Sequence, residues 1–149
     1  MKNARMAQKR KTTGCTCLRL RKASRRVSQI YDRSLEVAGV TVSQYGILGY
    51  ISRYDGVGIG ALAEKLIMDP TTLTRNLHPL QQRGLVALAR DVNDRRARRL
   101  HLTEAGRKAF AAAGPAWARA QRQIEQALGE DETPALNAAL DRVLERLAE

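Results

Sequence analysis

The chain has 149 residues and a formal net charge of +11, with 44% hydrophobic and only 4% aromatic residues. This length favours one domain with a real core, and this apolar content excludes a compositionally disordered chain. No run of about 18 apolar residues is present, and the basic N-terminus lacks the apolar core of a secretion signal, so neither a membrane span nor secretion is expected. Two cysteines, Cys15 and Cys17, are too few for a disulfide framework, so a reducing cytoplasm is the expected location.

The positive charge is unevenly distributed. Residues 1–26 contain ten Lys or Arg and no acid, residues 70–108 nine basic residues and three acids, and residues 109–149 four basic residues and seven acids. A basic middle beside an acidic C-terminal end indicates a surface for a polyanion, and nucleic acid is the natural choice. An acidic membrane surface is less favoured, because no basic amphipathic helix carries large apolar side chains. Residues 1–14 are most simply a solvated tail.

The first half of the chain is predicted to form four helices. Apolar residues recur at helical spacing in the first of them, and Gly39 ends it. Thr41 precedes Gln44 by three residues, a capping-box pattern that begins the second helix. Asp69 is a suitable N-cap for the fourth, with Pro70 at its first helical position. The predicted helices cover about 18–38, 42–53, 59–66 and 70–83.

After Gly84 the apolar pattern changes from helical to extended. Residues 85–88 and 96–102 resemble strands, and the polar stretch between them, "RDVNDR", is rich in turn formers. These features predict a two-stranded hairpin with a basic tip. A long helix capped by Thr103 then runs to about residue 128, and a last helix begins at Thr133-Pro134.

Helix, tight turn, helix and hairpin, in that order, make a winged helix-turn-helix, so the expected fold is mainly α with a small β-hairpin (α+β). Leu73, Leu77 and Leu80 are expected to lock the second helix of the pair onto the first. Its other positions carry groups suited to a DNA major groove, where Arg bonds guanine, Asn bonds adenine and a Thr methyl contacts thymine. The candidate DNA contacts of this helix are Thr71, Thr72, Thr74, Arg75, Asn76, His78 and Arg83.

The hairpin adds the candidate DNA contacts Arg95, Arg96 and Arg98. An arginine at the tip of a wing is suited to a narrow minor groove, where the negative potential is enhanced. Asp94 beside them is expected to orient a wing arginine rather than to face phosphate. Considered separately, the arginines could simply face solvent on the hairpin, and the threonines could simply cap the start of a helix. Their combination, in this order along the chain, indicates DNA binding.

The sequence resembles the multiple-antibiotic-resistance regulator (MarR) family. The resemblance covers about Cys17 to the C-terminus and depends on "LAEKLIMDPTTLTRNLHPLQQRGLV" and "DRRARRLHLTEAGR". It implies an obligate homodimer with intertwined first and last two helices, a recognition helix in the major groove and a wing in the minor groove. It also implies a transcription factor that often represses its own operon and is released by a small phenolic ligand or an oxidant.

The residues favour a homodimer on their own grounds as well, because the terminal helices carry apolar stripes without enough partners in so short a chain. A two-fold dimer would place two recognition helices about 34–36 Å apart and require a near-palindromic site. The expected organisation is a single MarR-like domain over 1–149, with a basic arm at 1–16, dimerisation helices at 17–53 and 103–149, and a DNA-binding lobe at 55–102.

The resemblance also suggests candidate redox-sensing residues, namely Cys15, Cys17 and Tyr31. In the organic-hydroperoxide branch of the family a cysteine at this place senses oxidants and is held by two tyrosines. Cys17 and Tyr31 resemble one such pair by spacing, but the second tyrosine is replaced by Val42. Two ordinary thiols are the simpler reading. A small phenolic or aromatic effector would bind where the dimer helices meet the DNA-binding lobe. Arg25, Tyr31, Tyr45, Tyr50 and Trp117 could contribute to such a pocket, although each fits the core or the dimer interface more simply.

Two other functional classes fit the sequence less well. An enzyme is not expected, because the sequence has no nucleophile elbow, no glycine-rich phosphate loop and no metal-spaced cluster, and no cofactor or metal is expected either. A non-specific architectural DNA-binding protein without an effector stays open as the alternative, since a basic surface alone binds DNA without sequence preference.

Overall fold

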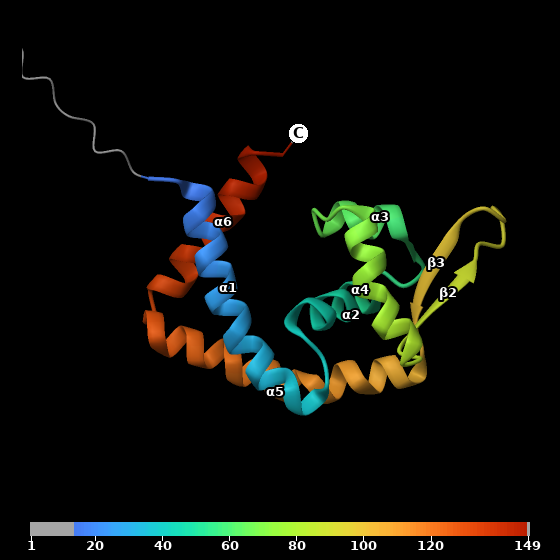
Figure 1. Ribbon diagram of the computed structural model, residues 1–149, viewed down its shortest axis with the longest axis horizontal. Coiled ribbons are helices and arrows are strands. Elements are labelled where there is room, and N and C mark those ends of the chain that lie inside the picture. The colour runs from blue at the N-terminus through green and yellow to red at the C-terminus, as the bar shows by residue number, and fades with distance from the viewer. Residues whose placement is uncertain (1–13, 149) are drawn as a thin grey trace, which may run out of the picture.

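The computed structural model describes residues 14–148, which form a limb of long helices and a compact lobe (Figure 1). Most of the predicted basic arm at 1–16 lies outside the described residues. The elements are α1 (Thr16–Leu35), η1 (Glu36–Ala38), α2 (Val42–Arg53), β1 (Val57–Gly58), α3 (Ile59–Lys65), α4 (Pro70–Gln82), β2 (Val86–Arg90), β3 (Arg98–Leu102), α5 (Glu104–Leu128) and α6 (Glu132–Arg146). The expected fold class, mainly α with a small β element, is confirmed.

The limb consists of α1, α5 and α6 (Figure 1). α1 packs along α5, and the Ser34 hydroxyl donates to the Ala116 carbonyl at 2.6 Å. The predicted first helix is therefore confirmed, although its last turn is the 3-10 element η1, which Gly39 ends with a left-handed φ of 67°. α5 continues through Pro115 over 25 residues and joins the limb to the lobe.

The lobe consists of α2, α3, α4 and a small sheet around a leucine-rich core. Its fully buried side chains include Leu48, Ile51, Leu62, Leu73, Leu77, Leu80 and Leu100. Because the leucines of α4 recur every three or four residues, they all point into this core and leave the other side of α4 facing outward. The predicted packing of α4 on α3 is confirmed.

The turn between α3 and α4 is fixed by backbone bonds. The Met68 N–H donates to the Ala63 carbonyl at 2.9 Å and the Ile67 N–H to the Glu64 carbonyl at 3.0 Å, a Schellman pattern. Ile67 takes a left-handed φ of 49° there, a conformation that β-branched residues rarely adopt. Asp69 then caps α4 by accepting from the Thr72 N–H at 3.0 Å, as the sequence predicted.

The sheet has three antiparallel strands in the order β1-β3-β2, and not the two strands that the sequence predicted. β1 pairs Val57 with Leu100 of the central strand, whereas β2 and β3 form the expected hairpin over five residues each. β1 escaped prediction because a strand of two residues is too short to show alternation.

The base of the wing is held tightly against the start of α5. The Thr103 side chain caps α5 by accepting from the Gly106 N–H at 2.9 Å, and the Thr103 N–H donates to the Leu85 carbonyl at 3.1 Å. A Cβ atom on Gly106 would lie 1.9 Å from that same carbonyl oxygen, so only glycine fits. The "LTEAG" stretch is therefore a backbone junction between the wing and α5.

α6 leaves much of its apolar stripe uncovered within the described chain. The exposed or partly exposed apolar residues are Leu136, Leu140, Val143 and Leu144 on α6 and Leu147 directly after it. None of the helices in residues 14–148 is long and apolar enough to cross a membrane.

Candidate nucleic-acid interface

The outward side of α4 carries most of the polar residues that the sequence singled out. Thr71, Thr72, Thr74, Arg75 and His78 are exposed, and Asn76 is half-buried. A shallow surface hollow of about 750 Å³ is lined by Pro70, Thr71, Thr74, Arg75, His78 and Pro79. The structure therefore brings the predicted helix contacts together on one accessible surface, with the exception of Arg83 at the far end.

Three of these six side chains are hydrogen-bonded near the start of α4, and the other three are open to a ligand. The Thr72 hydroxyl donates to Asp69 Oδ2 at 3.5 Å. The Thr74 hydroxyl donates to the Pro70 carbonyl at 2.9 Å, and the Asn76 amide to the Thr72 carbonyl at 2.9 Å. The side chains of Thr71, Arg75 and His78 make no hydrogen bond or ion pair with any residue in 14–148. Since a helix N-terminus also favours anions, this open surface suits a polyanion.

Arg83 behaves differently from the other predicted helix contacts. It follows the last turn of α4, and its Nη1 donates to the Gly39 carbonyl at 2.6 Å. The bond crosses from the recognition helix to the turn that connects α1 with α2. Arg83 is thus exposed, but its guanidinium is engaged within the chain.

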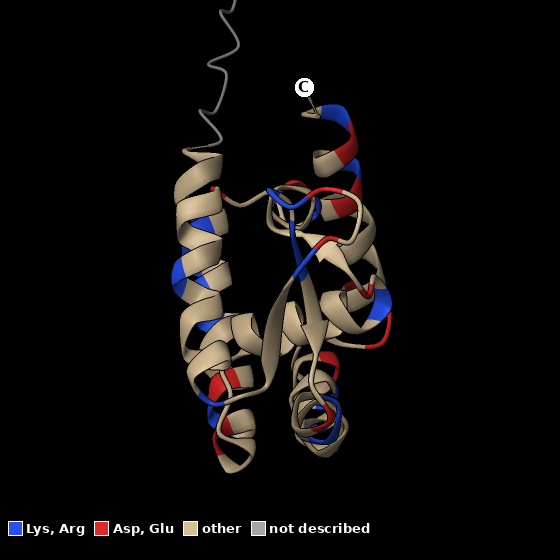
Figure 2. Cartoon of the chain, turned by 90° about the vertical axis from the view of Figure 1, so that its right-hand side faces the viewer, with Lys and Arg blue, Asp and Glu red and all other residues tan. Residues whose placement is uncertain are grey.

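The wing is the β2–β3 hairpin, which projects from the edge of the lobe (Figure 1) and carries several Lys or Arg positions (Figure 2). Arg95, Arg96 and Arg98 are exposed, and their side chains have no hydrogen-bond or ion-pair partner within the described residues. The predicted basic wing tip is therefore present, beside the exposed Val92.

Asp91 is the residue that orders the wing, and the sequence reasoning missed it. Its carboxylate accepts from the Asn93 N–H at 2.7 Å, the Asp94 N–H at 3.2 Å and Arg99 Nε at 2.6 Å. The Asn93 N–H and then the Arg99 side chain hold the pKa of the Asp91 carboxyl below its usual value. The carboxylate is therefore ionised at neutral pH and fixes both the turn and one arginine.

Asp94 was predicted to orient a wing arginine through its side chain. In the structure its carboxylate accepts from the backbone N–H of Arg96 at 2.9 Å, and its carbonyl accepts from the Ala97 N–H at 3.0 Å. Asp94 therefore shapes the turn that carries Arg95 and Arg96, whereas the side-chain ion pair belongs to Asp91 and Arg99. An acid that precedes the turn gave no distinctive signal in the sequence.

An aromatic hollow of about 400 Å³ lies where the limb meets the lobe. It is lined by Val42, Tyr45, Gly46, Gly49, Tyr50, Arg53, Tyr54, Phe110 and Trp117. Tyr45 stands 4.9 Å from Phe110 and 6.2 Å from Trp117 between ring centroids, so the wall is a continuous aromatic surface. Three of the five predicted effector residues, Tyr45, Tyr50 and Trp117, line it, and Arg25 and Tyr31 do not.

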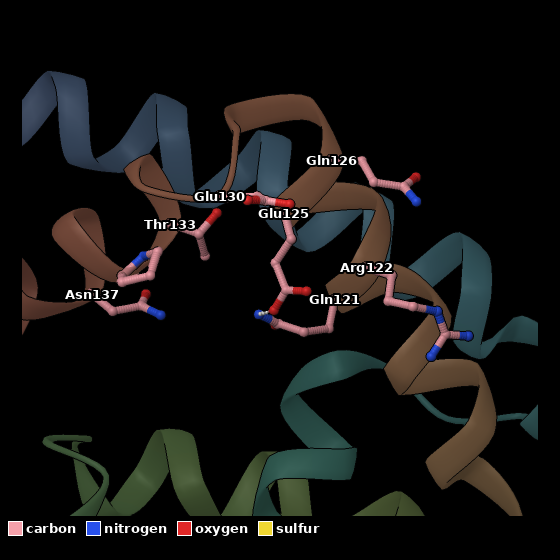
Figure 3. A pocket seen from close by; sticks show the side chains of 8 residues that line it. Gln121, Arg122, Glu125, Gln126, Glu130, Thr133 and Asn137 are labelled. Carbon is pink, nitrogen blue, oxygen red and sulfur yellow. Dashed lines mark hydrogen bonds between the residues drawn. The ribbon is translucent and has the colours of Figure 1, made fainter.

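Tyr31 instead joins a polar chain on the limb. Its hydroxyl donates to Gln121 Oε1, and Gln121 Nε2 donates to Glu125 at 2.8 Å, as Figure 3 shows for the second pair. Burial, and then the Glu125 charge, raise the pKa of the Tyr31 hydroxyl. Gln121 and Glu125 also line a hollow of about 560 Å³ at the corner between α5 and α6, where the buried Thr133 hydroxyl has no partner among the described residues.

The two cysteines lie at the start of α1 and are both exposed. Cys15 is the N-cap residue, and its sulfur accepts from the Leu18 N–H at 3.4 Å. Tyr31 lies fourteen residues after Cys17 on the same continuous helix, about 21 Å along its axis. The structure therefore does not bring Cys17 and Tyr31 together within one chain.

Within residues 14–148 no three His, Cys, Asp or Glu side chains are grouped in a way that would hold a metal ion. The site is thus built from hydrogen-bonding and cationic groups alone. A helix-turn-helix with an open polar face, followed by a wing with exposed arginines, defines the class of winged-helix DNA-binding proteins.

Comparison with known proteins identifies the family within this class. A family model described as the MarR family matches residues 38–97. The structure of the Mycobacterium tuberculosis transcriptional regulator MosR in complex with DNA superposes with a TM-score of 0.79 and 32% identity, over 89% of this chain and 95% of that one. The chain belongs to the MarR family, which makes it a transcriptional regulator by class and not an enzyme.

Two curated relatives match shorter segments. The transcriptional activatory protein BadR of Rhodopseudomonas palustris is 35% identical over 78 residues, which are 50% of this chain and 45% of BadR. The organic hydroperoxide resistance transcriptional regulator of Bacillus subtilis is 30% identical over 90 residues, which are 60% of this chain and 61% of that protein. The chain thus spans about half to three fifths of the length of these relatives.

Proposed function

We propose that this chain is a sequence-specific double-stranded DNA-binding regulator that binds a pseudo-palindromic operator as a homodimer and represses transcription by occupying it. One observation carries the proposal: α4 is locked to the core by Leu73, Leu77 and Leu80, while Arg75 and His78 on its other side lack any partner among residues 14–148. A basic side chain held rigidly and left unpaired is preorganised for a ligand.

The two DNA-facing regions have different roles in this proposal. α4 enters the major groove, where Arg75 reads guanine and the threonines make close backbone and methyl contacts. The wing follows the adjacent minor groove with its arginines. The residues assigned to the major groove are Thr71, Thr72, Thr74, Arg75, Asn76 and His78, and those assigned to the minor groove are Arg95, Arg96 and Arg98.

The homodimer forms through the limb. Leu147, Leu144 and the other stripe residues of α6 stay uncovered in the single chain, and Leu18 and Leu20 near the start of α1 are exposed too. Burial of such a stripe against a second copy removes apolar surface from water at about 25 cal/mol per Å².

The effector of the proposed regulator is a small aromatic acid that enters the aromatic hollow. Stacking on Tyr45 and Trp117 would hold the ring, and Arg53 at the rim would hold the carboxylate or phenolate. Because the hollow lies between α2 and α5, a ligand there changes how the lobe sits on the limb. Oxidation of Cys15 is a second way to release the regulator from its operator, because the sulfur of Cys15 caps α1 and the residue is exposed.

Selection of bound duplexes from random DNA tests the proposal, followed by titration of the selected site and a scrambled one over a salt series. The regulator is expected to bind the selected site about 10³-fold or more tightly than the scrambled one. Equal affinities that both collapse with salt would support an architectural protein instead. Repeating the titration with an oxidant, and separately with an aromatic carboxylate, tests the two routes to release.

The cytoplasmic location expected from the sequence is part of the same proposal, because an operator-binding regulator acts where the chromosome is.

A further inference from the structure

Arg83 connects the end of the recognition helix to the junction between limb and lobe. Its Nη1 donates to the Gly39 carbonyl at 2.6 Å, across 44 residues of sequence. Gly39 lies between η1 and α2, in the left-handed conformation with φ 67°. An arginine that donates to a backbone carbonyl makes a charge-assisted bond, which is shorter and stronger than a neutral one.

The same junction is held from two other directions. Asp32 of α1 accepts from the Val42 N–H at 2.7 Å, and Thr41 and Gln44 form a reciprocal capping box at the start of α2. Arg83 is the member of this set that comes from α4. The junction is therefore bonded to the limb, to α2 and to the recognition helix at once.

We propose that Arg83 is a positioning residue and not a phosphate contact: it fixes the orientation of α4 relative to the limb, and with it the half-site spacing that the dimer accepts. In a two-fold dimer the limb sets where each lobe starts, so the angle between limb and lobe decides how far apart the two recognition helices lie. This inference rests on the proposed function.

Two features separate Arg83 from the proposed DNA contacts. Arg75 and His78 have no partner in residues 14–148, whereas the guanidinium of Arg83 is already bonded to Gly39. Arg83 also stands at the C-terminal end of a helix of 13 residues, about 20 Å from the end that carries Thr71. A phosphate contact there would require the existing bond to break.

The first test compares the salt dependence of operator binding for Arg83→Met and for Arg95→Met, a matched loss of one guanidinium at the wing. Removal of a phosphate contact is expected to reduce the slope of log affinity against log salt by about 0.9. We expect Arg83→Met to weaken operator binding about tenfold, the effect of losing one charge-assisted bond, with the slope unchanged. A slope reduced as much as in Arg95→Met would overturn the proposal.

The second test uses operators whose half-sites are one base pair closer together or farther apart. The wild type is expected to discriminate strongly against both, and Arg83→Met to discriminate at least about threefold less, because its lobes are less constrained. General destabilisation would weaken binding to all three operators equally. Equal losses on all three would therefore overturn the proposal.

The third test needs no DNA, so it separates this inference from the proposed function. Amide hydrogen exchange of the free protein is expected to become faster at Gly39 to Val42 in Arg83→Met and to stay unchanged in Arg90→Met, an exposed arginine on β2. If exchange changes but no operator is found, the bond exists and the proposed function fails. Unchanged exchange at the junction would refute the positioning role itself.

Discussion

The recognition helix and the wing are held in place by different forces. α4 buries Leu73, Leu77 and Leu80 almost completely, so its outward residues are positioned by the lobe core. β2 buries only Val86, and the wing turn depends on the polar network around the half-buried Asp91 and the exposed Arg99. Buried apolar contacts resist local opening, whereas exposed hydrogen bonds and ion pairs break readily.

This difference suggests a division of labour in DNA recognition. A rigid helix can discriminate bases, because a bidentate contact needs its donors fixed in advance. A mobile wing can follow the variable width of a minor groove, where shape matters more than hydrogen-bond pattern. Specificity should therefore depend on the core behind α4, and the wing should contribute affinity.

The largest expected effect is on the free energy of unfolding, when a leucine is replaced by alanine in α4 and, for comparison, in the wing. Leu77→Ala removes a fully buried side chain and should lower the free energy of unfolding by about 3 kcal/mol. Leu88→Ala on β2, where the side chain is 38% exposed, should cost less than about 1 kcal/mol. Urea unfolding of both variants measures the difference, and similar losses would contradict the proposed contrast.

Arg75→Ala should be the next largest effect, and it concerns discrimination. The variant should lose about 1–3 kcal/mol on the selected site and relax the preference at one base position. Its unfolding free energy should not change, because Arg75 has no partner within residues 14–148. Competition binding against a set of single-base operator variants tests this, and full discrimination in Arg75→Ala would show that α4 is not the reading element.

Ile67→Gly should stabilise the turn that carries α4. Ile67 is 74% exposed and has a left-handed φ of 49°, so glycine removes strain and loses little burial. Removing the strained conformation should raise the free energy of unfolding by about 1 kcal/mol. The greater conformational entropy of glycine in the unfolded chain offsets part of this gain. Thermal unfolding should shift upward by a few degrees. A decrease would mean that the apolar environment of Ile67, in the hollow that it lines with Val143, Leu144 and Leu147, outweighs the backbone strain.

Asp91→Ala should have the smallest effect, confined to the wing. The pKa of the Asp91 carboxyl is lower in the folded protein than its usual value of 3.8. Its contribution to the stability of the wing is therefore fully present above pH 3.8 and is lost as the pH falls through the pKa of the folded state. Wing order should thus be independent of pH near neutrality, and the variant should bind its operator about threefold more weakly. Hydrogen exchange in the wing should rise in Asp91→Ala but not in Asp94→Asn, which keeps an acceptor oxygen.

The sequence predicted the elements whose signals are local. The capping box at Thr41, the Asp69 cap with Pro70, and the leucine spacing of α4 each act within one or two turns, and the structure has each of them. Helix ends were placed to within about three residues for the same reason.

The features that escaped prediction depend on partners distant in sequence. β1 exists only because Val57 meets Leu100, and no residue close to Arg83 in the sequence indicates its bond to the Gly39 carbonyl. Asp91 and Asp94 are the same residue type, and only the folded conformation of the turn determines that Asp91 is the one that binds Arg99. Residue type and periodicity carry no information on such pairings.

α5 has a mechanical consequence for any signal that reaches this protein. Its 25 residues form a rod about 37 Å long, with the wing junction at Gly106 at one end and the α6 corner at the other. A tilt of roughly 5° at one end displaces the other by about 3 Å, nearly the rise of one base pair. A rearrangement beside Trp117, midway along this helix, would therefore be larger where α5 meets the wing.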